Sequence, residues 1–524
     1  MVGVPGRSKG CKTCRARKKG CDLQRPQCGQ CIRSKVMCGG YNRDLTIIQH
    51  NPSIPVPRSR TDLSRRTAAK PRPDQTALHL RAVSSFEPLP QNLGCSAFET
   101  KTFELFWTDF LPRDHRCSTQ HYGIPAVTQW AKAIEKYSPG CEVLRSAFRA
   151  VSTSRIGLTS GNAAMTQQAI ELYGRALAQV NRALRDPQQV GRVELVASCK
   201  LLAMFEQYNS AKDRRAPGTN WIKHVQGVGR LIELRGPQQH CSDDEHIMFI
   251  DARLPLVIAA IGLRKATYLA RPEWNTLPWE RKPKTIRDEL VSIFALFPAI
   301  LAEHDTIQLS MKTPNCAELA KLQGLVRRCW RIDQQLQRWS QRFSRQLSDS
   351  PLKIRLMADA FTSDPGSLSP EDFVPLGYDV LYTAVLYWTA CLYTYNFLHT
   401  AIKTLSEHES DKAHVVLPTR TYPKLYAINI SRLTKYFFRE YSGLFSSQAI
   451  TFPLSSALQY VAEAGGDPEV EFAELVNTMQ QLSKMPSYSW IGHFMRGMRA
   501  ACVSHRDLLV LGSTTSDSVD TPSL

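Results

Sequence analysis

Six cysteines lie within the first 38 residues, in the pattern C-x2-C-x6-C-x6-C-x2-C-x6-C. The first three recur 17 positions later, which gives two half-sites, Cys11, Cys14, Cys21 and Cys28, Cys31, Cys38. A C-x2-C pair places two sulfurs on one side of a tight turn, which suits two vertices of a tetrahedral zinc–thiolate site. Three sulfurs cannot complete a four-coordinate ion. If one cysteine of each half bridges, however, six thiolates can serve two zinc ions.

Other uses of clustered cysteines are disfavoured by the sequence. A disulfide framework needs an oxidising compartment, and the N-terminal MVGVPGRSKG contains no apolar segment typical of a secretory signal. A metal-buffering protein is not expected to interleave its cysteines with Lys and Arg in one compact cluster. An RNA-binding role is disfavoured because no aromatic residue that could stack on a base lies between Cys11 and Cys38.

The stretch CKTCRARKKGCD, followed by RPQCGQC and Cys38, resembles the fungal Zn(II)2Cys6 binuclear cluster of transcription factors. The resemblance implies two Zn²⁺ ions per chain, bridged by the first and fourth cysteines, which are Cys11 and Cys28 here. The same resemblance divides the remaining ligands between the two ions as pairs, Cys14 with Cys21 and Cys31 with Cys38.

The two half-sites differ in charge, because RARKKG follows Cys14 whereas IRSKVM follows Cys31. Four cations occupy about one and a half helical turns of the first half, so some are expected to face a DNA groove and others the flanking phosphates. The resemblance implies that Lys18 contacts the bases of a CGG triplet. We expect phosphate or mixed contacts from the other cations, Arg15, Arg17 and Lys19. The alternative is a basic face that only keeps the cluster soluble.

Most of the charge of the chain lies near its N-terminus. The formal net charge of the 524 residues is +19, and residues 1–80 hold 17 Lys and Arg against 4 Asp and Glu. Such a concentration of positive charge indicates a polyanionic partner, for which double-stranded DNA is the first candidate. The basic run in the cluster, with further arginines downstream, also predicts import into the nucleus.

The composition predicts four regions along the chain. They are a Zn2Cys6 DNA-binding domain (1–45), a flexible linker rich in Pro, Arg and Ser (46–95), a large all-α regulatory domain (96–510) and a disordered tail (511–524). No heptad pattern follows the cluster, so no coiled-coil dimer is predicted there. We still expect a homodimer or a DNA-bound partner, because a single cluster buries only a small interface with DNA.

Apolar residues recur at steps of three and four beyond about residue 96, as in TQQAIELYGRALAQVNRALRD, and alternating strand patterns are absent. Three stretches resemble the fungal-specific regulatory domain found behind such clusters: FELFWTDFLP, HVQGVGRLIELRGP and RKATYLARPEWNTLPW. We expect these to serve packing. The uncharged run at 380–399 contains Thr, Asn and Tyr, which favours a buried core helix over a membrane span.

These patterns predict a nuclear, sequence-specific regulator of RNA polymerase II transcription that also contacts the transcription machinery or coactivators. The resemblance implies control of a metabolic or secondary-metabolite gene cluster. No enzyme is expected, because the chain lacks the spacing of a dinucleotide loop, an HExxH zinc site or a nucleophile elbow. No membrane partner is expected either. The alternative is a helical ligand-binding or enzymatic protein whose zinc cluster serves structure or protein contacts.

Overall fold

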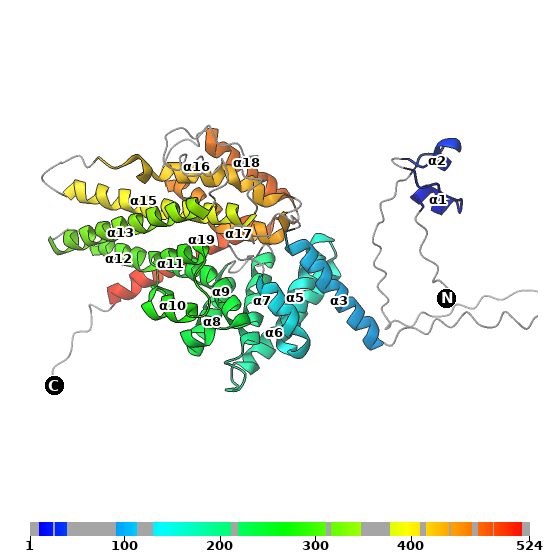
Figure 1. Cartoon of the computed structure of the whole chain (residues 1–524), viewed down its shortest axis with the longest axis horizontal. Coiled ribbons are helices and arrows are strands. Elements are labelled where there is room, and N and C mark those ends of the chain that lie inside the picture. Colours follow the sequence, from blue (N-terminus) through cyan, green and yellow to red (C-terminus); the bar gives the residue numbers. More distant parts are fainter. Residues whose placement is uncertain are drawn as a thin grey trace, which may run out of the picture. The chain divides into compact units, whose positions relative to one another are not determined.

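The computed structural model describes eleven segments of the chain, namely 10–24, 27–38, 91–112, 129–210, 218–310, 316–346, 378–408, 416–439, 442–463, 470–485 and 487–515. The chain forms two compact units, residues 1–86 and residues 87–524 (Figure 1). Each unit is described here by itself. The predicted linker lies outside the described residues up to residue 90.

The N-terminal unit contains two single-turn helices, α1 (Lys12–Ala16) and α2 (Gly29–Arg33). Its core consists of four buried cysteines. Among the described residues, the side chains that pack on them are the two remaining cysteines and Val36. A unit this small cannot bury enough apolar surface to fold through the hydrophobic effect alone. Its fold therefore depends on what the cysteines bind.

The described part of the second unit is mostly helical and contains no strand, as predicted from the apolar spacing. Its first helices are α3 (Gln91–Phe110), α4 (Gln129–Tyr137), α5 (Glu142–Thr159), α6 (Ala163–Ala183), α7 (Val193–Asn209), α8 (Thr219–Arg235), α9 (Asp243–Gly262) and α10 (Pro272–Thr276). They are followed by α11 (Ile286–Phe294), α12 (Phe297–Ser310), α13 (Cys316–Gln346), α15 (Tyr378–His408), α16 (Pro423–Thr434), α17 (Gly443–Glu463), α18 (Val470–Lys484) and α19 (Trp490–Thr515). Short 3-10 turns lie at η3 (Ser138–Gly140), η4 (Pro237–His240), η5 (Tyr268–Ala270), η6 (Leu277–Trp279), η9 (Thr419–Thr421) and η10 (Lys435–Phe438).

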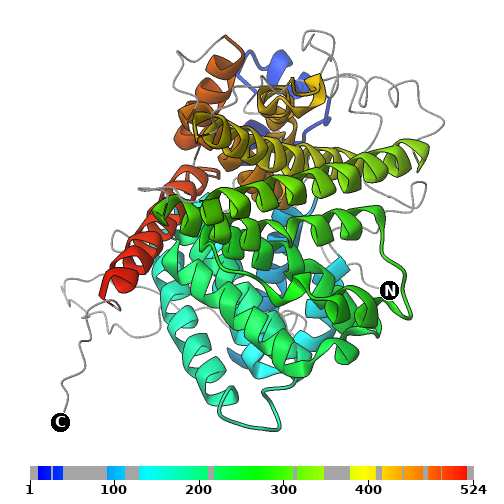
Figure 2. The same ribbon diagram turned by 90° about the vertical axis from the view of Figure 1, so that its left-hand side faces the viewer.

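Two groups of helices share one hydrophobic core in this unit. In the first group, α5 packs on α6 and α7, and α7 packs on α8; in the second, α15 packs on α13, α16 and α17. Helix α9 lies between them, in contact with α7 and α8 as well as with α11 and α12. Figures 1 and 2 show α13 and α15 side by side along the second group. The space between α7, α8, α9 and α17 is therefore walled by both groups.

Helix α15 is the central helix of the second group. Nearly all of its side chains from Tyr378 to Tyr395 are buried, as predicted for the uncharged run at 380–399. Its Tyr395 hydroxyl donates a 2.7 Å hydrogen bond to Asp333 of α13, and Arg420 pairs with the same carboxylate at 2.9 Å. Among the described residues, one stretch, 286–310, is long and apolar enough to cross a membrane, but core helices of globular proteins share that property.

The three stretches that resemble the regulatory domain form parts of α3, α8 and the turns around α10. Helix α8 ends at Arg235, and the following Gly236 has a φ of 77°, a positive value that glycine adopts without a Cβ clash. Trp274 and Trp279 are 3% and 8% exposed, which agrees with the packing role expected for them. Helix α3 starts at Gln91 and α19 continues to Thr515, so helix occupies the last five positions of the predicted linker and the first five of the predicted tail. The domain limits remain predictions.

A buried histidine makes the stability of this unit depend on pH. His240 is 2% exposed, donates from Nε2 to the Ile232 carbonyl at 3.2 Å and stacks on Phe249. Burial lowers its pKa to about 4, whereas an unfolded histidine titrates near 6.5. The unfolded chain therefore takes up a proton first as the pH falls, and stability present above pH 6.5 is lost between about pH 6.5 and 4.

We expect the free energy of unfolding of the full chain to fall by about 2 kcal/mol from this group between pH 7.5 and pH 5.0. Urea titrations at the two pH values measure the loss. The variant His240→Phe keeps a packed ring without a titrating group, so it should show a smaller difference between the two pH values. An unchanged pH dependence in this variant would contradict the assignment.

Candidate metal centre and nucleic-acid interface

The two halves of the N-terminal unit repeat each other in backbone as well as in cysteine spacing. Each helix begins directly after a cysteine whose sulfur accepts a hydrogen bond from the amide three residues on: Cys14 N to Cys11 Sγ at 3.3 Å, and Cys31 N to Cys28 Sγ at 3.4 Å. The sulfur therefore occupies the place of a helix N-cap oxygen. The C-x2-C spacing thus directs both sulfurs of each pair to the same side of its helix.

All six predicted ligand sulfurs are brought together by this fold. They form two groups of four whose sulfurs lie within 4.8 Å of one another, Cys11, Cys14, Cys21, Cys28 and Cys11, Cys28, Cys31, Cys38. Cys11 and Cys28 belong to both groups, and their sulfurs are 3.6 Å apart. A tetrahedral ion with Zn–S bonds of about 2.3 Å requires sulfurs about 3.8 Å apart. The donor set therefore fits tetrahedral zinc.

Four of the six thiols of this centre are shielded from water. Cys11, Cys14, Cys28 and Cys31 are at most 1% exposed. Burial raises the pKa of the Cys14 thiol to about 12, and it raises the pKa values of Cys28 and Cys31 as well. Without a metal these thiols keep their protons at neutral pH, so binding of a metal must displace them.

The ends of both helices have an unusual backbone. Lys18 and Lys35 have φ values of 52° and 51°, in the left-handed region where a side chain is strained. In both halves, the amide after the lysine donates to the carbonyl of the second cysteine, Lys19 N to Cys14 O at 3.0 Å and Val36 N to Cys31 O at 3.1 Å. This is the helix C-terminal motif that usually contains glycine. A lysine at this position turns the chain sharply and places its side chain beyond the last helical turn.

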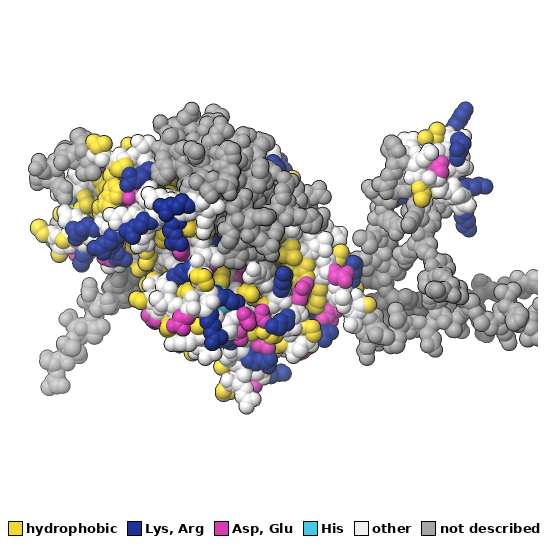
Figure 3. Space-filling view, in the orientation of Figure 1, with side chains coloured by type: hydrophobic (Ala, Val, Ile, Leu, Met, Phe, Trp, Pro, Cys, Tyr) yellow, Lys and Arg dark blue, Asp and Glu magenta, His cyan; other side chains and the backbone are white. Residues whose placement is uncertain are grey.

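Three of the four predicted DNA-contacting cations are exposed: Arg17, Lys18 and Lys19. The side chain of Arg15 lies outside the described residues. Figure 3 shows Lys and Arg side chains projecting from one side of the N-terminal unit. The exposed face can approach a polyanion, and the individual DNA contacts remain predictions.

A carboxylate that the sequence analysis did not single out connects the two halves. Asp22 Oδ1 accepts a 3.0 Å hydrogen bond from Gly29 N at the start of α2, and Asp22 Oδ2 lies 3.5 Å from Arg33 Nη2. Thr13 adds a second connection, because its hydroxyl donates to the Met37 carbonyl at 2.9 Å. An acidic residue one position after a metal-binding cysteine was the available signal for Asp22. These contacts fix how the two helices face each other.

Replacing Gly29 with alanine is expected to loosen this connection. A Cβ at that position would lie 2.5 Å from Asp22 Oδ2, so the carboxylate would have to leave the helix N-terminus. Loss of such a cap costs about 1 kcal/mol. We expect Gly29→Ala to lose zinc several-fold more readily in a chelator competition. Gly20→Ala is the matched control, because a Cβ there meets nothing within 4 Å. Equal zinc retention by both variants would contradict the role of Asp22.

Comparisons with known families agree with both units. Residues 9–46 match the fungal Zn(2)-Cys(6) binuclear cluster domain. Residues 129–409 match the fungal specific transcription factor domain, a match that covers more than half of the chain. The chain belongs to this family. The match to the binuclear cluster domain implies zinc binding by the N-terminal unit, and both matched families are transcription factor domains rather than enzymes.

Two curated proteins are similar to this transcription factor. One is an uncharacterized protein of Emericella nidulans, 23% identical over 278 residues, which are 53% of this chain and 53% of that protein. The other is arginine metabolism regulation protein II of Saccharomyces cerevisiae, 43% identical over 61 residues, which are 10% of this chain and 7% of that protein. The chain thus spans about half the length of the first relative and a small part of the second. No solved structure matches it.

Proposed function

We propose that this transcription factor holds two Zn²⁺ ions on its six N-terminal cysteines and reads CGG-type triplets of double-stranded DNA with Lys18. The observation that carries the proposal is the division of six sulfurs into two groups of four that share Cys11 and Cys28. Two tetrahedral ions need eight ligand positions, and six thiolates supply eight only if two of them bridge. The shared pair is the one that the sequence resemblance implied.

The zinc ions would supply the fold of the N-terminal unit rather than a reaction. The described residues of this unit bury little besides cysteine, so the metal-thiolate bonds replace a hydrophobic core. Six thiolates and two Zn²⁺ carry a net charge of −2, which the neighbouring RARKK run offsets. Bound zinc would thereby hold α1 in the orientation in which its basic residues face DNA.

Lys18 is the residue best placed to read a base. It follows the last turn of α1, is exposed, and lies in the half whose cations outnumber those of the other half. An extended cation that reaches the O6 and N7 edge of guanine is the commonest specific contact in the major groove. Arg15, Arg17 and Lys19 would then bind phosphates, which position the helix without selecting a sequence.

The test is selection of binding sites by the zinc-loaded full-length protein from a randomised duplex pool, with zinc per chain and salt dependence measured on the same preparation. We expect two zinc ions, enrichment of CGG-type triplets and an affinity that falls steeply as salt increases. The spacing of the enriched triplets would show whether the protein binds as a homodimer. Two zinc ions without enrichment would instead favour the alternative, a helical ligand-binding or enzymatic protein whose cluster serves structure or protein contacts.

The wider role follows from this activity. We infer that the protein acts in the nucleus on RNA polymerase II genes and contacts the transcription machinery or coactivators, in keeping with its family. Control of a metabolic or secondary-metabolite gene cluster is the corresponding proposal for its targets. The name of the Saccharomyces cerevisiae relative supports metabolic control in general, and its similarity is confined to 61 residues.

A further inference from the structure

The helical unit contains a cavity of about 750 Å³, partly open to solvent, between α7, α8, α9, α17 and α19. Protein interiors are close-packed and contain few voids larger than a water molecule. A cavity of this volume is instead typical of sites that hold small organic molecules. It lies in the second unit and belongs to neither the cysteine cluster nor the basic face of α1.

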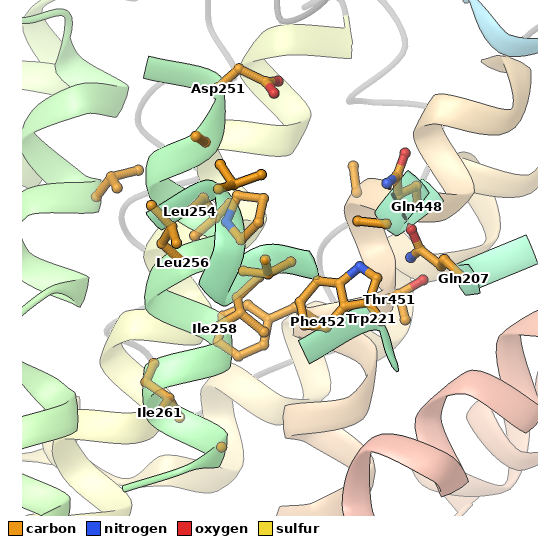
Figure 4. Close-up of a pocket in the computed structure, with 18 of the residues that line it drawn as sticks. Gln207, Trp221, Asp251, Leu254, Leu256, Ile258, Ile261, Gln448, Thr451 and Phe452 are labelled. Carbon is orange, nitrogen blue, oxygen red and sulfur yellow. Dashed lines mark hydrogen bonds between the residues drawn. The ribbon is translucent and has the colours of Figure 1, made fainter. Parts of the chain in front are cut away.

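One wall of the cavity is apolar. Helix α9 contributes Leu254, Leu256, Ile258 and Ile261, which Figure 4 shows along one side of the close-up. Four methionines, Met204, Met248, Met495 and Met498, also line the cavity. Methionine side chains are flexible and polarizable, so they can adjust to the shape of an apolar ligand. Most of any molecule held here would therefore have to be apolar.

The opposite side of the cavity carries hydrogen-bond donors. In Figure 4, Gln207, Gln448, Thr451 and the indole nitrogen of Trp221 lie together, away from the α9 side chains. Gln448 donates to Gln207 Oε1 at 2.7 Å and accepts from the Tyr208 hydroxyl at 3.3 Å. These contacts use the acceptor of Gln207 and leave its amide N–H groups available.

Two of these donors have no acceptor among the described residues. Gln207 is 3% exposed and its side-chain N–H groups donate no hydrogen bond there, and the indole N–H of Trp221, which is 7% exposed, donates none either. Both nitrogens remain accessible from the cavity, so water or an acceptor of a bound molecule can reach them. A ligand that displaced this water without supplying an acceptor would lose about 1–3 kcal/mol per donor, so an acceptor oxygen of the ligand is expected beside them.

One cation of the cavity lining is already paired. Lys200, two turns before Gln207 on α7, forms an ion pair with Asp251 of α9, and its ammonium lies 4.1 Å from the centre of the Trp130 ring. A buried carboxylate ligand would need a cation of its own to offset the loss of hydration. Neutral donors beside an occupied cation favour an uncharged acceptor, such as a carbonyl oxygen.

We propose that this cavity is a binding site for a neutral, largely apolar molecule with a carbonyl group, whose oxygen accepts hydrogen bonds from Gln207 and Trp221. The carbonyl lies at the polar wall, and the apolar body lies against α9 and the methionines. The site joins α7 and α8 of the first helical group to α17 of the second. A molecule bound there contacts both groups at once.

Three naphthalene probes test the ligand class on the zinc-loaded full-length protein. The first is the neutral ketone 6-propionyl-2-(dimethylamino)naphthalene; the second is 2-(dimethylamino)naphthalene, which lacks the carbonyl; the third is 6-(dimethylamino)-2-naphthoate, which is an anion. We expect the ketone to bind saturably, and a fluorescence titration measures this binding. The carbonyl-free probe should bind about tenfold more weakly, because a net hydrogen bond contributes about that factor. The anion should also bind more weakly than the ketone, because its carboxylate would lose hydration without a cation to offset that loss.

Substitutions locate the acceptor contact. Gln207→Leu nearly keeps the side-chain volume, and Trp221→Phe keeps a smaller aromatic ring without the N–H group. They should weaken ketone binding about tenfold and several-fold, and each should affect the carbonyl-free probe less than the ketone. Gln459→Leu is the matched control, because this glutamine also lines the cavity but donates to Glu463 at 2.7 Å. It should leave the ketone affinity unchanged. Circular dichroism and thermal unfolding establish that each variant is folded.

Two results would overturn the proposal. One is failure of all three probes to bind saturably, which would mean that the cavity does not accept such molecules. The other concerns the ratio of ketone affinity to carbonyl-free probe affinity. If this ratio is the same in the parent protein, in Gln207→Leu and in Trp221→Phe, these donors do not contact the carbonyl.

Discussion

Alanine at Lys18 is expected to leave two zinc ions bound and to reduce the preference for a CGG site over a scrambled duplex by roughly 5- to 150-fold. That range corresponds to the 1–3 kcal/mol of discrimination that a good contact between a cation and a base provides. The side chain of Lys18 is exposed and is not one of the cluster ligands. Alanine at φ 52° experiences nearly the same backbone strain as lysine, so the fold should not change.

Lys35 is the matched control within the same unit. It has the same backbone conformation at the end of α2, and it is also exposed. Lys35→Ala should leave the triplet preference unchanged and weaken binding to all duplexes only slightly. Competition titrations at one fixed salt concentration compare the variants, and metal analysis counts the zinc. The assignment fails if Lys18→Ala keeps its preference, or if both variants lose it equally.

Replacing Cys28 with alanine is expected to cost the protein both zinc ions. Cys28 belongs to both groups of four sulfurs, so its removal leaves neither group with four ligands. Its sulfur also accepts the amide hydrogen bond that begins α2. Because this unit has little core besides its cysteines, specific DNA binding should be lost together with the metal. Zinc per chain after desalting, measured on the full-length protein, gives the result directly.

Cys38→Ala provides the comparison. Cys38 belongs to only one group, and its loss leaves Cys11, Cys14, Cys21 and Cys28 complete. We expect this variant to retain one zinc ion, whereas Cys28→Ala retains none. One retained zinc ion in Cys28→Ala would contradict the shared-ligand arrangement, and the helical unit should keep its thermal transition in either variant because it has a separate core.

Much of the metal centre could be predicted from the sequence, because its information is local. A C-x2-C pair and a third cysteine recur after 17 residues, which gives six cysteines. Two tetrahedral ions need eight ligand positions, so two of the six cysteines must be shared. The family resemblance named Cys11 and Cys28, and the structure brings their sulfurs together in both groups. Helical periodicity and the uncharged run at 380–399 likewise sufficed for an all-α unit with α15 in its core, since each pattern depends only on neighbouring residues.

The connections across the N-terminal unit were decided only by the tertiary structure. Nothing in the basic run RARKKG indicates that Lys18 adopts the left-handed conformation, because lysine has no preference for it. The conformation follows from the need to turn the chain after Cys14 so that the third cysteine can reach the cluster. The contact between Asp22 and Gly29 also depends on how the two halves face each other.

The cavity in the helical unit shows the same limit on a larger scale. In the sequence, Gln207 and Trp221 are ordinary members of α7 and α8, and Gln448 lies 241 positions beyond Gln207. Periodicity assigns each residue to a face of its own helix, but it contains no information on which faces meet or where they leave a space. Sequence alone sufficed to predict which cysteines come together and that the large unit is helical. The packing of helices distant in the chain decided where unpaired donors converge on a cavity.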